Sequence, residues 1–261
     1  DEESSVWYSD DGGKTWEIGK SAPQQMAILS LAAAQDDRVY AGTAGQGVWA
    51  SHDGLAWQPT TGQPASAHIT ALASAGDGRV YALAAGTLYT SDDRGETWRP
   101  AGPADFRALS LAVEPGPEGR IYLGSASKGL TVSEDGGLNW LRLGAEFCQA
   151  DVTCLSASPG TPGTAYLGTL RNGLHKTEDG GRSWRLISAE VGKPVVSALA
   201  QDHLQPQVLC WHAGRGIQNR RWWPKLASGE RGDGQALRPG AGGGHRGAGG
   251  SLRRGAHRRL R

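Results

Sequence analysis

The sequence lacks several features that define major classes of protein. No stretch approaches the ~20 consecutive apolar residues of a membrane-spanning helix, so we expect no membrane span. The three cysteines, Cys148, Cys154 and Cys210, show no metal-ligand spacing, and their odd number argues against a disulfide scaffold. A single disulfide between Cys148 and Cys154 stays open. Because residue 1 is not methionine and no secretory signal is present, we expect the natural N-terminus to lie upstream.

Acidic residues are scarce in the last part of the chain, and the rest of the chain has fewer basic than acidic residues. Residues 213–261 hold twelve Lys and Arg against two Asp and Glu, whereas the remaining 212 residues hold 15 against 24. The net charge of +1 therefore hides an acidic region followed by a basic one. We predict a folded domain over residues 1–212 and a disordered, Gly/Arg-rich tail over residues 213–261.

The sequence does contain an internal repeat. The segment "SDDGGKTW" at residues 9–16 recurs as "SHDGLAW" (51–57), "SDDRGETW" (91–98), "SEDGGLNW" (133–140) and "TEDGGRSW" (177–184). The tryptophans that close these segments are separated by 41, 41, 42 and 44 residues. A period of about 40–45 residues is typical of the four-stranded blades of a β-propeller.

The residues between these segments favour the same fold, because helical periodicity is absent and short strands recur. Each period has a first strand with a small residue before leucine, such as Ser30-Leu31, and a second strand centred on a tyrosine, such as Tyr40. A third strand leads into the repeated turn, and a fourth starts at its tryptophan. We predict an all-β fold, a β-propeller of four-stranded antiparallel blades that starts in mid-blade. Four full blades are expected with partial blades at both ends, and residues 4–19 could pair with residues 194–210 to close a small ring.

The repeated turn has a structural explanation. Its Ser or Thr and its Asp hydrogen-bond nearby backbone groups, its Gly supplies a positive φ, and its Trp packs against neighbouring strands. Since these carboxylates recur once per blade, we interpret them as turn residues and not as a catalytic pair. The second copy is one residue short and the third has Arg94 at a glycine position, so both turns should deviate. The turn residues are Ser9, Asp11, Gly13, Trp16, Ser51, Asp53, Trp57, Ser91, Asp93, Gly95, Trp98, Ser133, Asp135, Gly137, Trp140, Thr177, Asp179, Gly181 and Trp184.

The pattern Ser/Thr-x-Asp-x-Gly-x-x-Trp resembles the Asp-box of the BNR (bacterial neuraminidase) repeat family, and its five copies cover residues 1 to about 208. In style the blades are most similar to photosystem II assembly and stability factors and to other BNR-like repeat proteins. Sialidases and xyloglucanase-type glycoside hydrolases share the box, so the resemblance implies the propeller fold and no single activity. It also implies that the boxes lie opposite the ligand face, and it favours an extracytoplasmic or cell-surface location.

By the same resemblance, sialidase chemistry would need an arginine triad, a tyrosine nucleophile with a glutamate partner, and an acid/base aspartate. The nearest match to the first arginine motif, "FRAL" from Phe106, lacks the proline, and the tyrosines of the second strands recur as core residues. The histidines form no metal motif, and His175 fills a third-strand position that holds aromatic residues in other blades. We therefore predict no catalytic residue, no metal and no cofactor.

A non-catalytic binding or assembly module is the interpretation that we favour. The ligand face of a propeller is built by the loops that join the fourth strand to the next first strand, and the second strand to the third. Solvated loop residues without a function are the competing interpretation of any candidate there. The alternative function is a fragment of a glycoside hydrolase whose catalytic residues lie outside this chain. The candidates for contact with a protein or carbohydrate ligand are Gln24, Gln25, Lys128, Glu146, Phe147, Arg171 and Asn172.

The basic tail starts where the repeat pattern is lost, near residue 210. Read one nucleotide later, any Trp codon becomes a Gly codon, so Trp211 becomes Gly. The shifted tail is also compatible with a sixth box that ends at residue 226, which is 42 residues after Trp184. We therefore hypothesise a frameshift at residues 208–210. The alternative is a nucleic-acid-binding arm, with arginines for phosphates and tryptophans for bases, and we expect no nucleic-acid partner.

Overall fold

The computed structural model describes residues 6–19, 27–34, 36–62, 64, 67–116, 119–188, 195–201 and 208–212. The chain divides into a unit of residues 1–229 and a second unit, residues 230–261, that lies outside the described residues. Regular structure in the described part is all β, apart from one turn of 3-10 helix, η1 (Ala145–Phe147). The predicted all-β class is confirmed.

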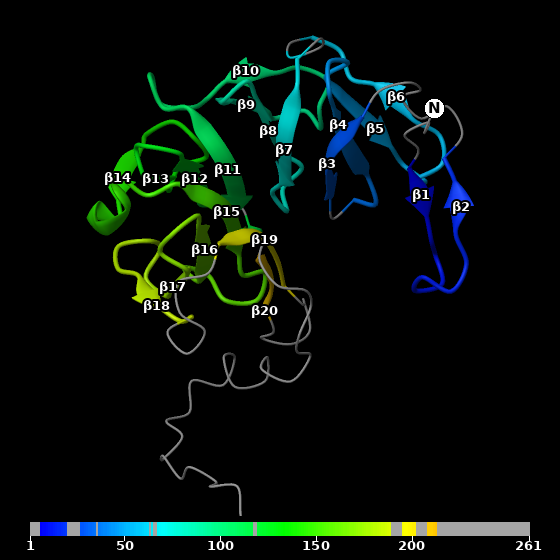
Figure 1. Ribbon diagram of the computed structural model, residues 1–261. Helices are drawn as coiled ribbons and strands as arrows, with labels where there is room; N and C mark the ends of the chain where they lie inside the picture. The colour runs from blue at the N-terminus through cyan, green and yellow to red at the C-terminus, as the bar shows by residue number, and fades with distance from the viewer. Residues whose placement is uncertain are drawn as a thin grey trace, which may run out of the picture. The chain divides into compact units, whose positions relative to one another are not determined.

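Four sheets of four antiparallel strands follow one another along the chain, as the sequence predicts (Figure 1). Blade I contains β3 (Ile28–Ala33), β4 (Val39–Thr43), β5 (Val48–Ser51) and β6 (Gln58–Pro59). Blade II contains β7 (Ile69–Ser74), β8 (Val80–Ala84), β9 (Thr87–Ser91) and β10 (Arg99–Pro100). Blade III contains β11 (Ala108–Val113), β12 (Ile121–Ser125), β13 (Leu130–Ser133) and β14 (Leu141–Leu143). Blade IV contains β15 (Val152–Ala157), β16 (Ala165–Thr169), β17 (Leu174–Thr177) and β18 (Arg185–Leu186).

A two-stranded hairpin stands at each end of this series. The first consists of β1 (Trp7–Tyr8) and β2 (Glu17–Ile18), and the last consists of β19 (Val196–Gln201) and β20 (Val208–His212). These hairpins form separate sheets, so the suggested pairing between them, which would close a small ring, is wrong. The first hairpin instead packs on blade I, where Val6 shares an apolar cluster with Ala41 and Trp57.

The first strands of successive blades contact one another, β3 with β7, β7 with β11, β11 with β15 and β15 with β19. The small residue of each first strand faces this contact. The Ser30 hydroxyl donates to the carbonyl of Ile69 in the next blade at 3.3 Å, and the Ser110 hydroxyl donates to the carbonyl of Val152 at 3.2 Å. A larger side chain would separate the strands, which explains the small residue in the repeat.

At a second position, the size of the side chain in one blade depends on the size of a side chain in the next blade. Gly42 lies opposite Ser30 in the sheet, and a Cβ on Gly42 would come within 2.6 Å of Ile69. Blade II has Leu83 at the equivalent position, and the blade after it begins with Ala108 in place of Ile or Val. Leu83 and Ala108 are both buried in one cluster. At the junction of blades I and II the small residue is in blade I and the large one in blade II, whereas at the next junction the large residue is in blade II and the small one in blade III. Close packing requires one large and one small residue at each junction.

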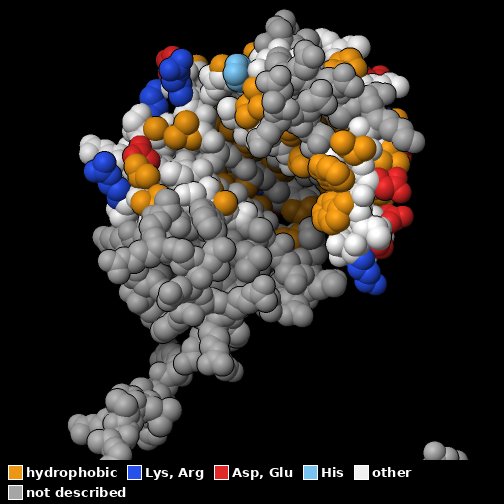
Figure 2. All heavy atoms as spheres, turned by 45° about the vertical axis from the view of Figure 1, so that its right-hand side comes forward, with side chains coloured by type: hydrophobic (Ala, Val, Ile, Leu, Met, Phe, Trp, Pro, Cys, Tyr) orange, Lys and Arg blue, Asp and Glu red, His pale blue; other side chains and the backbone are white. Residues whose placement is uncertain are grey.

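The core lies between neighbouring blades. One apolar cluster combines Tyr81 and Leu88 of blade II with Leu111 and Ile121 of blade III. Every first strand also carries a β-bulge at its second residue, and such a bulge redirects a side chain. The bulged leucines Leu29 and Leu109 are 44% and 50% exposed. In the space-filling view, apolar side chains lie around a hollow in one face (Figure 2).

Candidate functional site

The predicted turns form the same hydrogen-bonded structure in successive blades. In blade III the Ser133 hydroxyl donates to Asp135 at 2.8 Å and accepts the N–H of Gly137 at 2.8 Å. The carboxylate of Asp135 accepts the N–H of Asn139 at 2.8 Å, and the indole N–H of Trp140 donates to the carbonyl of Gly137 at 3.1 Å. These bonds occupy the polar groups of the box, and the Trp140 indole N–H also donates to the carbonyl of Ala101 after β10 at 2.8 Å, which agrees with a structural role.

The hydrogen bonds hold the box carboxylates in the ionised form. The pKa of Asp11 falls to about 2, chiefly because its carboxylate accepts the backbone N–H of Thr15. The pKa of Asp93 also falls to about 2, chiefly through the hydroxyl of Thr97. A carboxyl with so low a pKa is a poor general acid or base at neutral pH. The boxes are therefore unsuited to acid/base chemistry.

The two irregular boxes behave differently from each other. In the short second box the carboxylate of Asp53 accepts the N–H groups two and three residues later, whereas that of Asp135 accepts those three and four residues later, so this turn deviates as expected. The third box keeps the regular bonds, with the N–H of Gly95 on Ser91 at 2.7 Å. Arg94 adopts φ 63°, close to the glycines at the same position in other boxes. The expected deviation of the third box is therefore wrong, because Arg94 accepts a left-handed conformation.

Tyr122 and Glu114 form a tyrosine–glutamate pair, the kind of pair that sialidase chemistry would need. The Tyr122 hydroxyl donates to Glu114 at 2.6 Å, and Arg120 pairs with the same carboxylate at 3.1 Å. The backbone N–H of Gly163 in blade IV also donates to Glu114, at 3.1 Å. Burial and the nearby carboxylate both raise the pKa of Tyr122, which disfavours a phenolate nucleophile. The pair links blades III and IV at the end of the sheets that carries the boxes.

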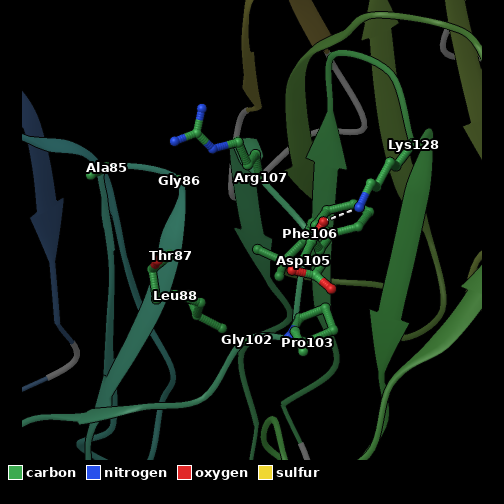
Figure 3. A pocket seen from close by; sticks show the side chains of 12 residues that line it. Ala85, Gly86, Thr87, Leu88, Gly102, Pro103, Asp105, Phe106, Arg107 and Lys128 are labelled. Carbon is green, nitrogen blue, oxygen red and sulfur yellow. Dashed lines mark hydrogen bonds between the residues drawn. The ribbon is translucent and has the colours of Figure 1, made fainter.

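A groove lies at the opposite end of the sheets, at the junction of blades II and III. Its volume is about 650 Å³, within the usual range for ligand pockets. It is bounded by the β8–β9 turn, the loop from β10 to β11, and Lys128 before β13 (Figure 3). This is the end at which the second-to-third and fourth-to-first connections meet, which is where the sequence predicts a ligand face. The lining residues are Ala85, Gly86, Thr87, Leu88, Gly102, Pro103, Ala104, Asp105, Phe106, Arg107, Leu123 and Lys128.

The groove has an apolar floor and a charged rim. Leu88 and Leu123 are 1% exposed, and Phe106 is 7% exposed. On the rim, Lys128 Nζ donates to the backbone carbonyl of Asp105, which ties the blade III loop to the loop that enters the blade. The Arg107 side chain is exposed and extends toward the Ala85–Gly86 turn, away from Lys128 (Figure 3). The groove therefore presents charged groups at its rim above a base of buried apolar side chains.

The predicted ligand-face residues are distributed over several loops. Lys128 lines the groove, Glu146 is exposed on η1, and Arg171 is exposed in the β16–β17 loop. Asn172 lies in the same loop, where its N–H donates to Thr169 at 2.8 Å. Gln24 and Gln25 lie outside the described residues. Lys128 is the candidate among them that the groove brings together with other polar side chains.

Phe147 was predicted to belong to the ligand face, and this prediction is wrong. Its side chain is 1% exposed and packs edge-on against His175, with ring centroids 4.8 Å apart, and against Trp184 at 6.1 Å. Phe147 is therefore a core residue between a loop and blade IV, and His175 has the packing role expected of it. An aromatic residue in a loop gave no sequence signal of this burial.

The sequence interpretation missed the residues that form the groove opposite Lys128. Arg107 sits just before β11 and resembles the start of an ordinary strand. One signal was present: Tyr40 pairs with Ala50, ten residues later, whereas Tyr81 pairs with Thr90, nine residues later. The second-to-third connection of blade II is thus one residue shorter. Ala85 and Gly86 form this two-residue turn, with φ of 50° and 81°.

No group of three or more His, Cys, Asp or Glu side chains is placed for a metal ion in the part of the chain that the structure describes. Cys148 and Cys154 form no disulfide with each other, so the bond that the sequence left open is absent between these two described residues. Among the described residues, no helix is long and apolar enough to span a membrane.

Comparison with known proteins agrees with the architecture. Residues 1–106 match the family model of the DUF6242 beta propeller domain, and no curated protein matches the chain. The GH74 xyloglucanase of Xanthomonas campestris is similar at 27% identity and a TM-score of 0.57, over 80% of this chain and 32% of that enzyme. The chain thus spans about a third of the length of this enzyme.

Two further structures share the fold. YCF48 bound to D1 peptide has 14% identity and a TM-score of 0.51, over 79% of this chain and 83% of YCF48. The GH74 enzyme of Niastella koreensis has 20% identity and a TM-score of 0.57, over 71% of this chain and 33% of the enzyme. The chain is a β-propeller of repeated four-stranded blades, and its matches are consistent with the BNR-like propeller family.

Proposed function

We propose that this chain is a non-catalytic β-propeller module that binds a segment of a partner protein in the groove between blades II and III. The observation that carries the proposal is the groove itself, with its apolar floor at Leu88 and Leu123 and its charged rim at Arg107 and Lys128. Such a mixture suits a peptide, which offers apolar side chains and polar groups together. YCF48, which shares the fold, is described as bound to a peptide.

Catalysis fits this groove poorly. Glycosidases of the usual kind place two carboxyl groups on either side of the scissile bond. Asp105 is the single acidic residue among the residues that line the groove. A neutral carbohydrate offers no charged group to Arg107 and Lys128 on the rim, whereas a peptide can supply one.

The proposal is tested by selecting short random peptides from a displayed library against the purified chain. We expect enriched peptides whose binding is lost in Ala104→Trp, which fills the groove at an exposed position. Arg142→Glu, an exposed change on β14 that does not line the groove, is the matched control and should leave binding intact. Peptides that bind equally to both variants, or no enrichment at all, would contradict the proposal.

A second function deserves a test because the chain is 27% identical to a GH74 xyloglucanase over 80% of its length. In that case the chain is a part of a glycoside hydrolase whose catalytic residues lie outside this chain. The measurement is turnover of fluorogenic xyloglucan and sialoside substrates by the full protein that contains this chain. Turnover of either would favour the enzyme, and its absence together with peptide binding would favour the binding module.

A further inference from the structure

The rim of the groove carries an excess of positive charge. Arg107 and Lys128 face one acidic side chain, Asp105, among the lining residues. Lys128 is held by a backbone carbonyl, which neutralises none of its charge. No ion pair to Arg107 is present within the described ranges of the chain. Both cations are therefore available to an anionic ligand group.

The short turn in blade II borders one side of the groove. In blade I the longer connection reaches the next blade, since Ala44 forms a bridge with His68. In blade II the turn ends at Gly86, whose carbonyl accepts the N–H of Ala108 at 3.0 Å.

The turn itself is under backbone strain. Ala85 has φ 50° and Asp105, across the groove, has φ 59°, so two non-glycine residues of the lining adopt the left-handed conformation. Each such residue costs of order 1–2 kcal/mol, and strain of this kind concentrates at binding sites. A two-residue hairpin turn requires positive φ at both central residues, so the strain of Ala85 follows from the short turn that borders the groove.

We infer that the groove selects an extended acidic peptide, in which one carboxylate pairs with Arg107 on the side of the Ala85–Gly86 turn, a second pairs with Lys128 on the opposite side, and the side chain between them lies over the buried base of the groove (Figure 3). The short turn at Ala85–Gly86 determines this specificity, because a connection of the ordinary length would cover the floor. This inference rests on the proposed function and adds to it the charge of the partner and the element that selects it.

The test uses three labelled peptides that differ in charge alone. One alternates aspartate with leucine, and the others carry lysine or serine in place of aspartate; binding to the full chain is followed by fluorescence anisotropy at low and moderate salt. We expect the aspartate peptide to bind about tenfold more tightly than the serine peptide, which corresponds to about 1.4 kcal/mol. The preference should weaken as salt rises.

Two variants separate charge from shape. Arg107→Glu should reverse the preference toward the lysine peptide, and Arg142→Glu, outside the groove, should not. Replacing residues 84–87 by the sequence of residues 43–47 should weaken binding of every peptide, because it installs the longer connection of blade I. Ala104→Trp tests the same floor if the turn replacement fails to fold.

The outcomes are distinguishable. Equal binding of the three peptides, lost in Ala104→Trp, would overturn the acidic preference and leave the proposed function in place. An acidic preference that survives the turn replacement in a folded variant would overturn the role of the turn. Failure of every peptide, including library-selected ones, would overturn the proposed function as well.

Discussion

Arg94 shows how a single residue can conflict with its backbone and still preserve a motif. It adopts φ 63° at a position that is glycine in the other boxes, and its carbonyl accepts hydrogen bonds from Tyr40 at 3.0 Å and Arg38 at 3.3 Å. Its side chain pairs with Asp36 at 3.3 Å, with 56% of the Arg94 side chain exposed. The ion pair is worth little at such exposure. The turn is therefore held by its main-chain bonds at the cost of strain.

We predict that Arg94→Gly stabilises the protein. Relief of the left-handed strain should exceed the extra entropy of glycine in the unfolded chain, for a net gain of about 0.5–1 kcal/mol in the free energy of unfolding. The measurement is chemical denaturation of both proteins. Arg94→Ala keeps the Cβ and should show no comparable gain; if Ala stabilises as much as Gly, strain is not the cause.

Leu83 and Ala108 lead to a second prediction at the residue scale. Ala108→Val should destabilise the protein by about 1–3 kcal/mol, because Leu83 already fills the space that glycine leaves open in other blades. Leu83→Gly alone should cost more, through the cavity that it creates. The double variant should be more stable than the sum of the two changes predicts, by about 0.5–3 kcal/mol. Additive effects in a double-mutant cycle would show that the two positions do not share one space.

At the scale of the element, the box hairpin couples folding to the ionisation of its aspartate. The pKa values of Asp11, Asp93 and Asp179 are lowered to about 2 from 3.8, and those of Asp53 and Asp135 are lowered as well. A lowered pKa in the folded state contributes stability above the unfolded value. That contribution is lost as the pH falls through the folded value. The boxes should therefore weaken between about pH 4 and pH 2.

We predict that Asp93→Asn lowers Tm at neutral pH and that the difference from the unchanged protein narrows as the pH falls from 4 to 2. The reason is that the unchanged carboxylate becomes protonated over this range and loses its advantage over the neutral amide. Thermal unfolding across this pH range provides the measurement. Asp92→Asn, on a neighbouring exposed residue outside the box pattern, serves as the control. A difference that stays constant down to pH 2 would contradict the assigned role of the charge.

At the scale of the whole molecule, the register of the last hairpin bears on the reading frame. Residue 211 lies opposite Ala198, as Gly42 lies opposite Ser30 and Gly168 opposite Cys154. A reading one nucleotide later gives glycine at residue 211, in agreement with this register. We propose that the native frame continues the propeller beyond residue 212 and that the Gly/Arg-rich tail, which lies outside the described residues, is its shifted product.

The frame proposal predicts a difference in limited proteolysis. The chain with the present sequence should be cleaved soon after residue 212. A chain with the corrected reading frame should instead yield a resistant fragment that extends past the sixth box at residue 226. Mass spectrometry of the fragments gives the boundary. The coding DNA is an independent check, since codons at 221 or 226 that cannot yield Asp and Trp in the shifted frame would exclude it. A salt-sensitive affinity for RNA or DNA that depends on residues 213–261 would favour the alternative arm.

The sequence by itself determined the local structure of this protein. Five copies of the box at a period of about 42 residues predicted the four full blades, and the Ser, Asp and Gly of the box form the hydrogen bonds that their chemistry allows within one turn. The tertiary structure decided how blades meet. It placed Ala108 against Leu83, buried Phe147 and left a groove beside the short turn at Ala85–Gly86. Such features depend on space shared by residues far apart in the chain, and a local sequence pattern does not contain that space.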